Sequence, residues 1–154
     1  MIRDTLITFT TDPKTHPAVV GDITARGEAF VVAELAGEVV GFASYAPFRA
    51  GPGYAHTQEH TIHLTAAARG RGVGRALMVR LEQVAGQSGV HVLVAGISSA
   101  NPGGIAFHSA IGFSEVGRMP QVGRKGEKWL DLVLMQKILP LRDETAPDSG
   151  ASAR

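Results

Sequence analysis

The sequence predicts an α/β or α+β domain built on a single mixed sheet. Short apolar segments typical of strands recur along the chain, and two segments between them carry apolar residues at helical spacing. With 154 residues, 44% of them hydrophobic, the chain has the size of one domain with a buried core. We therefore expect one domain over residues 1–139. The remaining residues, 140–154, are rich in Pro, Asp, Ser and Ala, which favours a mobile tail.

The strands are expected where β-branched and aromatic residues cluster between turn residues. The first two form a hairpin, because Gly37 and its neighbours supply a turn between two apolar runs. A segment with two prolines, 47–53, then interrupts the sheet. The predicted strands are 30–33, 39–43, 57–65, 90–97, 113–117 and 129–138.

Two helices are expected between these strands. From Val73 onward apolar residues recur at helical spacing until the glycine-containing segment 86–89 ends the helix. Asn101 and Pro102 resemble a helix start, with Asn as the cap and Pro in the first turn, and Gly112 ends this second helix.

The segment 69–75, Arg-Gly-Arg-Gly-Val-Gly-Arg, lies between the third strand and the first of these helices. Its alternating glycines permit positive φ angles, so that successive N–H groups can point at one anion. The positive end of the following helix lies nearby, and three guanidiniums can neutralise a pyrophosphate. This segment therefore predicts a site for a nucleotide-tailed cofactor.

The spacing within this segment narrows the class of cofactor. A nucleoside-triphosphate loop needs Gly-Lys-Ser/Thr, but Arg75 follows Gly74. A dinucleotide loop needs a third glycine where Arg75 or Leu77 stands. An Arg-x-x-Gly-x-Gly pattern remains at 69–74. A basic glycine-rich turn that binds nothing is the alternative interpretation.

Charge and composition exclude several other classes of function. The formal net charge is +1, from 15 basic and 14 acidic residues, so we expect no nucleic-acid and no membrane partner. The chain has no cysteine, which excludes disulfides, thiolate zinc sites and a cysteinyl intermediate. His56, His60 and His63 have no matching carboxylate cluster, so we expect no metal. The polar N-terminus and the lack of a membrane-length apolar run suggest a cytoplasmic protein.

The pattern at 69–74 resembles the coenzyme A pyrophosphate loop of the GNAT acyltransferase superfamily. Residues 4–138 are similar to one branch of it, the phosphinothricin and methionine sulfoximine/sulfone N-acetyltransferases. The matching segments are 42–45, 52–54, 56–61, 69–75, Asn101, 107–108, 112–113, 119–125 and 129–132. The chain departs from that branch at 62–64 and 126–128, which affects the expected shape of the pocket. A single mixed-sheet GNAT fold is implied, without the branch's first strand and most of its first helix, which would precede Asp4.

The resemblance also implies an activity. We expect direct, sequential transfer of acetyl from acetyl-CoA to the α-amine of methionine sulfoximine, methionine sulfone or phosphinothricin. Another amine, a protein N-terminus, or a non-catalytic acyl-CoA-binding module are the alternatives. A symmetric homodimer is also expected, because the hairpin edge would be open and 129–134 offers an apolar outer face. Residues 119–125 would then lie near the mouth of the active site.

The resemblance assigns roles to individual residues. Glu59 would be the general base, and His108 would protonate the leaving thiolate. The cofactor would be bound by Ile62, His63 and Leu64 through their main chain, by Asn101, and by Arg69, Gly70, Arg71, Gly72, Val73, Gly74 and Arg75. The substrate would be bound by Arg49, Glu59, His60 and Thr61. As alternatives, Glu59 is a solvated carboxylate, His108 packs a helix, Arg49 is an exposed loop residue, and Asn101 only caps its helix.

Overall fold

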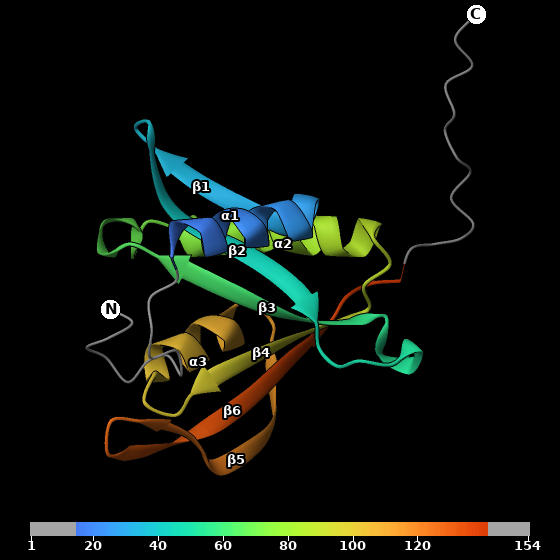
Figure 1. The fold of residues 1–154 in the computed structure, drawn as a ribbon, viewed down its shortest axis with the longest axis vertical. Helices are drawn as coiled ribbons and strands as arrows, with labels where there is room; N and C mark the ends of the chain where they lie inside the picture. The colour runs from blue at the N-terminus through green and yellow to red at the C-terminus, as the bar shows by residue number, and fades with distance from the viewer. Residues whose placement is uncertain (1–14, 142–154) are drawn as a thin grey trace, which may run out of the picture.

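The computed structural model describes residues 15–141, which form six strands and three α-helices (Figure 1). The helices are α1 (His16–Arg26), α2 (Val73–Gln87) and α3 (Pro102–Ala110). The strands are β1 (Phe30–Leu35), β2 (Glu38–Pro47), β3 (Thr57–Leu64), β4 (Val92–Ser98), β5 (Ser114–Lys125) and β6 (Lys128–Ile138). All six predicted strands and both predicted helices are present, and the prediction of a single mixed sheet is confirmed.

The strands lie in the order β1-β2-β3-β4-β6-β5. Every neighbouring pair is antiparallel except β3 and β4, which run parallel. The sheet therefore has two antiparallel halves that meet at one parallel junction. Figure 1 shows α1 and α2 beside the half that contains β1 to β3, and α3 beside β4.

The two faces of the first half carry different helices. On β2, Gly41 faces α2, since a Cβ atom there would lie 3.4 Å from Leu77 Cδ1. Ser44 lies on the opposite face, where it accepts a hydrogen bond from Arg26 of α1. Side chains that are paired across an antiparallel ladder share a face. Because Ser44 pairs with Thr61 and Gly41 with Leu64, odd-numbered residues of β3 share the α1 face and even-numbered residues share the α2 face.

The hydrophobic core lies between α2 and the sheet. Leu77, Met78 and Leu81 of α2 are almost fully buried, as are Leu93 of β4 and Val133 of β6. Removal of this apolar surface from water is the main stabilising contribution. Lys137 of β6 adds a polar connection, because its ammonium donates to both carboxylate oxygens of Glu82 and to the Ile111 carbonyl. This contact ties β6 to α2 and to the end of α3.

Helix α1 was missed by the sequence prediction. Thr15 caps it by accepting a hydrogen bond from the Ala18 N–H, and Pro17 stands in its first turn. None of its residues is buried. Its apolar residues Val19, Val20 and Ile23 remain exposed, so α1 buries no apolar side chain in the described structure.

Strand β5 is longer than predicted, because it continues through Pro120 to Lys125. A register irregularity lies between Met119 and Gly123, where Gln121 has a φ of 59° and its N–H donates to the Asp131 carboxylate. This side-chain acceptor allows pairing with β6 to resume after a segment that resembles a loop in sequence.

At the other end of the sheet, β1 pairs only with β2 within the described residues. The prediction that a first strand is missing before Asp4 refers to positions outside the described residues. Most of the predicted tail, 140–154, also lies outside them. None of the helices between residues 15 and 141 has the length and apolar character that a bilayer crossing requires.

Candidate active site

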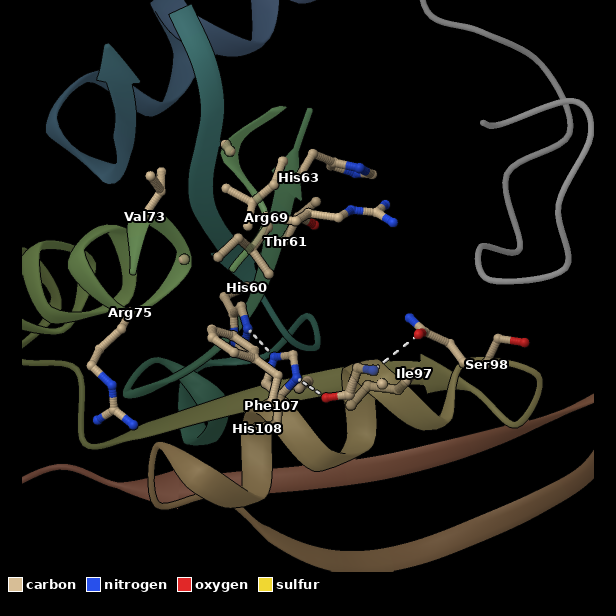
Figure 2. Close-up of a pocket in the computed structure, with 18 of the residues that line it drawn as sticks. His60, Thr61, His63, Arg69, Val73, Arg75, Ile97, Ser98, Phe107 and His108 are labelled. Atoms are coloured by element: carbon tan, nitrogen blue, oxygen red, sulfur yellow. Dashed lines mark hydrogen bonds between the residues drawn. The ribbon is translucent and has the colours of Figure 1, made fainter. Parts of the chain in front are cut away.

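The candidate site is a cleft that opens where β3 and β4 separate. The parallel ladder joins residues 57–59 to residues 92–94 and then ends, although both strands continue. A cavity of about 810 Å³ lies beyond this point. Its walls come from β3, the loop before α2, the end of β4, and α3 (Figure 2). Beyond residue 59, β3 and β4 no longer pair with each other.

Most of the residues expected at the site line this cleft. They are Glu59, His60, Thr61, Ile62, His63, Leu64, Arg69, Gly70, Gly72, Val73, Gly74, Arg75, Asn101 and His108. Two others do not line it. Arg71 is exposed in the loop, and Arg49 lies after β2 with its guanidinium 5.5 Å from the Phe48 ring centroid. Residues 119–125 also contribute nothing to the cleft of a single chain.

The glycines of the loop have two different functions. Gly70 and Gly72 have φ angles of 71° and 77°, and a Cβ atom on either would meet no atom within 4 Å. They therefore give the loop its conformation and leave its surface open. Gly74 instead lies in α2, where a Cβ atom would come within 3.2 Å of Leu64 and of Phe107. The expectation of three positive φ angles is thus corrected for Gly74, which permits close packing.

Arg69 and Arg75 carry the positive charge at the cleft. Both side chains are exposed, and in Figure 2 they point in different directions, Arg75 from α2 and Arg69 from the preceding loop. The start of α2 adds unpaired N–H groups and the positive end of the helix dipole. This end of the cleft can therefore bind an anionic group.

Asn101 caps α3, as its position in the sequence suggested. Its Oδ1 accepts a hydrogen bond of 2.9 Å from the Gly104 N–H. A Cβ atom on Gly104 would lie 2.5 Å from Asn101 Nδ2, so the cap requires glycine at that position. The side chain lines the cleft at the same time.

Glu59 lies on the α1 face of β3, at the point where the ladder with β4 ends. The residue is exposed, yet partial burial of its carboxyl group against the cleft raises the pKa of this group above its ordinary value. Gly96 of β4 leaves room for it, since a Cβ atom there would lie 3.0 Å from Glu59 Oε1. A carboxylate with a raised pKa accepts a proton more readily, as a general base must.

His60 and His108 form a buried pair on the opposite face. Their Nε2 atoms are 2.9 Å apart, and His108 Nδ1 is 2.7 Å from the Gly104 carbonyl oxygen (Figure 2). The two residues are only 6% and 5% exposed. Burial, followed by the repulsion of His108, lowers the pKa of His60 to about 3. Burial also lowers the pKa of His108. Both rings are therefore neutral near pH 7.

Several cleft residues had no role assigned from the sequence. They are Ala68, Ala95, Gly96, Ile97, Ser98, Gly103, Gly104 and Phe107. The end of β4 belongs to the site because β4 runs parallel to β3, so that both carboxyl ends reach the same edge. The pairing of these two strands was the missing information, and the strand pattern alone does not provide it. The Gly103-Gly104 pair after Asn101-Pro102 was a usable signal for close approach of the backbone.

The arrangement suits a long ligand with an anionic group at one end. The loop and the start of α2 can hold the anion, and the edge of β3 beyond its ladder with β4 can hold an extended chain. Glu59 lies where that chain would end. No group of three or more His, Asp or Glu residues in the described range 15–141 is placed to hold a metal ion.

Comparison with known proteins adds independent information. The family model described as the acetyltransferase (GNAT) family matches residues 2–113. An L-methionine sulfoximine/L-methionine sulfone acetyltransferase of Salmonella typhimurium is 42% identical over 123 residues, which are 80% of this chain and 71% of that protein.

Two solved structures are also similar. A phosphinothricin acetyltransferase of the GNAT superfamily from Sinorhizobium meliloti, in complex with acetyl-CoA, has a TM-score of 0.81 and 31% identity. That similarity covers 96% of this chain and 85% of the other. A ribosomal-protein-alanine N-acetyltransferase from Brucella melitensis has a TM-score of 0.82 and 40% identity, over 90% of this chain and 87% of the other.

Proposed function

We propose that this chain, which belongs to the acetyltransferase (GNAT) family and is an acetyl-CoA-dependent N-acetyltransferase, acetylates the α-amine of small amino-acid analogues. Methionine sulfoximine, methionine sulfone and phosphinothricin are the proposed substrates, since similar proteins carry these names. The observation that carries the proposal is the position of Glu59. It lies where the ladder between β3 and β4 ends and lines the same cleft as the loop before α2.

The cleft residues fit acetyl-CoA, whose thioester supplies the activated acetyl group. Arg69, Arg75 and the N–H groups of the loop would hold its pyrophosphate, because Gly70 and Gly72 leave that surface open. The main chain of residues 62–64 would hold the pantetheine arm, and Asn101 would add a polar contact. A backbone N–H near Leu64 would polarise the acetyl carbonyl.

Glu59 is the proposed general base. An amino acid carries an ammonium group at neutral pH, and this group must lose a proton before its nitrogen can attack a carbonyl. The Glu59 carboxylate takes that proton directly or through a water molecule. Thr61 lies on the same face and is proposed to contact the substrate.

His108 is the proposed acid for the leaving thiolate. In the structure both of its ring nitrogens are engaged, one by Gly104 and the other by His60. Donation to a thiolate therefore requires that one of these hydrogen bonds is exchanged. A thiol has an ordinary pKa of about 8.5, so the donor assists the reaction without being essential.

Arg49 and His60 complete the proposed substrate site, with a condition on each. Arg49 lies outside the cleft, so its guanidinium must turn from Phe48 toward the substrate to bind a carboxylate in bidentate fashion. His60 is buried, so it can contact the substrate only from within the cleft wall.

A second candidate substrate is the amine at a protein N-terminus. It is favoured by the 40% identity to the ribosomal-protein-alanine N-acetyltransferase. The open α1 face around Glu59 does not by itself select between a free amino acid and a peptide end.

Release of free thiol from acetyl-CoA across a panel of amines tests the proposal. The panel contains methionine sulfoximine, methionine sulfone, phosphinothricin, methionine and a peptide with N-terminal alanine. We expect the highest kcat/KM with one of the first three. A preference for the peptide would support the second candidate. Binding of acetyl-CoA with no turnover of any amine would instead favour a non-catalytic acyl-CoA-binding module.

We also propose that the enzyme is a cytoplasmic homodimer without nucleic-acid or membrane partners. Support for the dimer comes from the exposed apolar residues Val116, Met119, Val122 and Trp129 on β5 and β6, of which Trp129 is 56% exposed. Light scattering at micromolar concentration tests it. A fully active species of about 16.2 kDa would contradict the dimer. A cytoplasmic location is part of the proposal, and cell fractionation tests it.

A further inference from the structure

The contacts of His108 determine where its protons lie. A carbonyl oxygen only accepts hydrogen bonds, so the contact with Gly104 requires a proton on His108 Nδ1. In a neutral imidazole the other nitrogen, Nε2, then has no proton. The 2.9 Å contact between the two Nε2 atoms therefore requires that His60 Nε2 carries the proton and donates it.

We propose that His60 is a positioning residue for His108: its Nε2–H group occupies the acceptor nitrogen of His108 and holds that ring neutral, with its single proton directed at α3. This inference rests on the proposed function only for its effect on catalysis. The assignment of tautomers rests on the contacts of the two rings.

The surroundings of the pair support this arrangement. The Phe113 ring lies 5.2 Å from both imidazoles, and the Phe107 ring lies 5.2 Å from His108 at nearly a right angle. On β2 the residue paired with His60 is Tyr45, which is also buried. Burial and then the repulsion of His108 lower the pKa of His60, and the Val94 backbone on β4 acts in the opposite direction.

The remaining nitrogen of the pair shows what the arrangement costs. His60 Nδ1 is buried and has no hydrogen-bond partner of good geometry. A buried acceptor without a hydrogen bond destabilises the folded chain. His108 requires the single ring proton of His60 on Nε2, and this leaves His60 Nδ1 as the acceptor without a partner. The arrangement is consistent with a role of His60 beyond packing.

The functional consequence is a restriction on His108. In the free enzyme it has no proton to give to the cleft, because the Nδ1 proton is bound by Gly104 and Nε2 is an occupied acceptor. His60 thereby keeps the α2-face wall of the cleft uncharged. Loss of the His60 donor would free Nε2 and allow His108 to bind a second proton.

Long-range ¹H–¹⁵N NMR of the full chain with labelled histidine tests this inference without any turnover. We expect a protonated Nδ1 on His108, a protonated Nε2 on His60, no titration of His60 between pH 8 and pH 5, and a His108 midpoint below the ordinary histidine value. A proton on His108 Nε2, or a midpoint near the ordinary value of about 6.5 for either ring, would overturn the proposal.

Two variants test the effect of the donor. His60→Ala removes it, and we expect the His108 midpoint to rise by about one pH unit or more as water reaches Nε2. His60→Gln keeps an N–H donor of similar reach and should leave the midpoint low. An unchanged midpoint in His60→Ala would contradict the role. Should His60→Ala not fold, the wild-type tautomers and the His60→Gln titration decide.

Kinetics then separates this inference from the proposed function. We expect His60→Ala to change the pH dependence of kcat with little change in the KM for acetyl-CoA. His60→Gln should keep the wild-type midpoints of that dependence, although its absolute rate falls because His60 also belongs to the proposed substrate site. If no amine is acetylated, the proposed function is wrong. The NMR experiment still tests the tautomers of His60 and His108, because it does not depend on turnover.

Discussion

Glu59 and His60 are neighbours on β3, yet they face opposite sides of the sheet and differ in almost every physical respect. Glu59 is exposed at the mouth of the cleft on the α1 face, whereas His60 is buried against His108 on the α2 face. Burial disfavours the charged form of both groups, so it raises the pKa of Glu59 and lowers the pKa of His60.

The comparison shows how one strand serves two purposes. The alternation of side chains along β3 places a group that must exchange protons with substrate on the open face, and a group with fixed protons on the closed face. The open face is where we expect changes to affect turnover. The closed face is where we expect changes to affect stability and the protonation of His108.

The largest expected effect is on the open face. Glu59→Gln removes the base but keeps the shape of the side chain, so turnover should fall by roughly 10²- to 10⁴-fold. The affinity for acetyl-CoA and the thermal midpoint should remain nearly unchanged. Initial rates, calorimetric titration of acetyl-CoA and thermal unfolding measure these quantities.

Glu38→Gln on the exposed start of β2 is the matched control for this loss of charge. The acid limb of the wild-type pH profile should lie above the range of an ordinary carboxyl group, because burial raises the Glu59 pKa. This limb should be absent from Glu59→Gln. A full rate in the variant at every pH would remove Glu59 as the base.

A second change sharpens the comparison on the cofactor side. Arg69→Glu or Arg75→Glu should weaken acetyl-CoA binding by roughly 10- to 100-fold, through loss of a charge-assisted hydrogen bond and addition of repulsion. The KM for the amine should change much less. Arg71→Glu should have a smaller effect, because Arg71 does not line the cleft.

Arg80→Glu on the exposed side of α2 controls for net charge. Acetyl-CoA affinity is measured by calorimetry at two salt concentrations. Equal losses in all four variants would indicate a general electrostatic effect and would contradict a local phosphate site.

The third prediction concerns stability on the closed face. The unfolded chain binds a proton at His60 below about pH 6.5, whereas the folded chain resists this protonation down to about pH 3. The free energy of unfolding should therefore decrease as the pH falls from 6.5 toward 3, at up to about 1.4 kcal/mol per pH unit for this one group. Urea unfolding at pH 7 and pH 5 measures the change.

His60→Gln has no such protonation and keeps His108. Its free energy of unfolding should decrease less over the same interval. An identical decrease in the variant would show that His60 does not contribute to the acid sensitivity.

The smallest effect is expected at Gly96. A Cβ atom in Gly96→Ala would lie 3.0 Å from Glu59 Oε1, and the flexible carboxylate can move away at little cost. Turnover should fall by roughly two- to tenfold as the base is displaced. In the Glu59→Gln background the same change should add almost nothing to the loss, because the two residues are in contact.

Gly117→Ala is the matched strand control, since a Cβ atom there meets nothing within 4 Å. Additive losses in the double variant would show that Gly96 acts independently of Glu59.

Much of the fold was predictable because local signals agreed with the final contacts. The glycines of 69–75, the cap at Asn101 and the turn around Gly37 each report a local backbone geometry that the structure confirms. The family resemblance was carried by the same loop, and the match to the acetyltransferase family confirms it.

The remaining features depend on contacts between distant residues. The sequence does not reveal that β4 lies beside β3, so the roles of Gly96 and Ser98 in the cleft were missed. The contact between His60 and His108 joins residues 48 positions apart, and neither has a local pattern that indicates its partner. Helix α1 was missed although Thr15 and Pro17 give it the same kind of start signal that Asn101 and Pro102 give α3.

The short ladder between residues 57–59 and 92–94 has a mechanical consequence. Two antiparallel half-sheets are joined there by few backbone hydrogen bonds, so the angle between them is a soft degree of freedom compared with motions inside either half. A ligand that forms hydrogen bonds to both strands would restrict this angle. The lost freedom of motion would make the binding free energy less favourable. The stiffness of the sheet, in addition to the residues of the cleft, therefore contributes to the strength of cofactor binding.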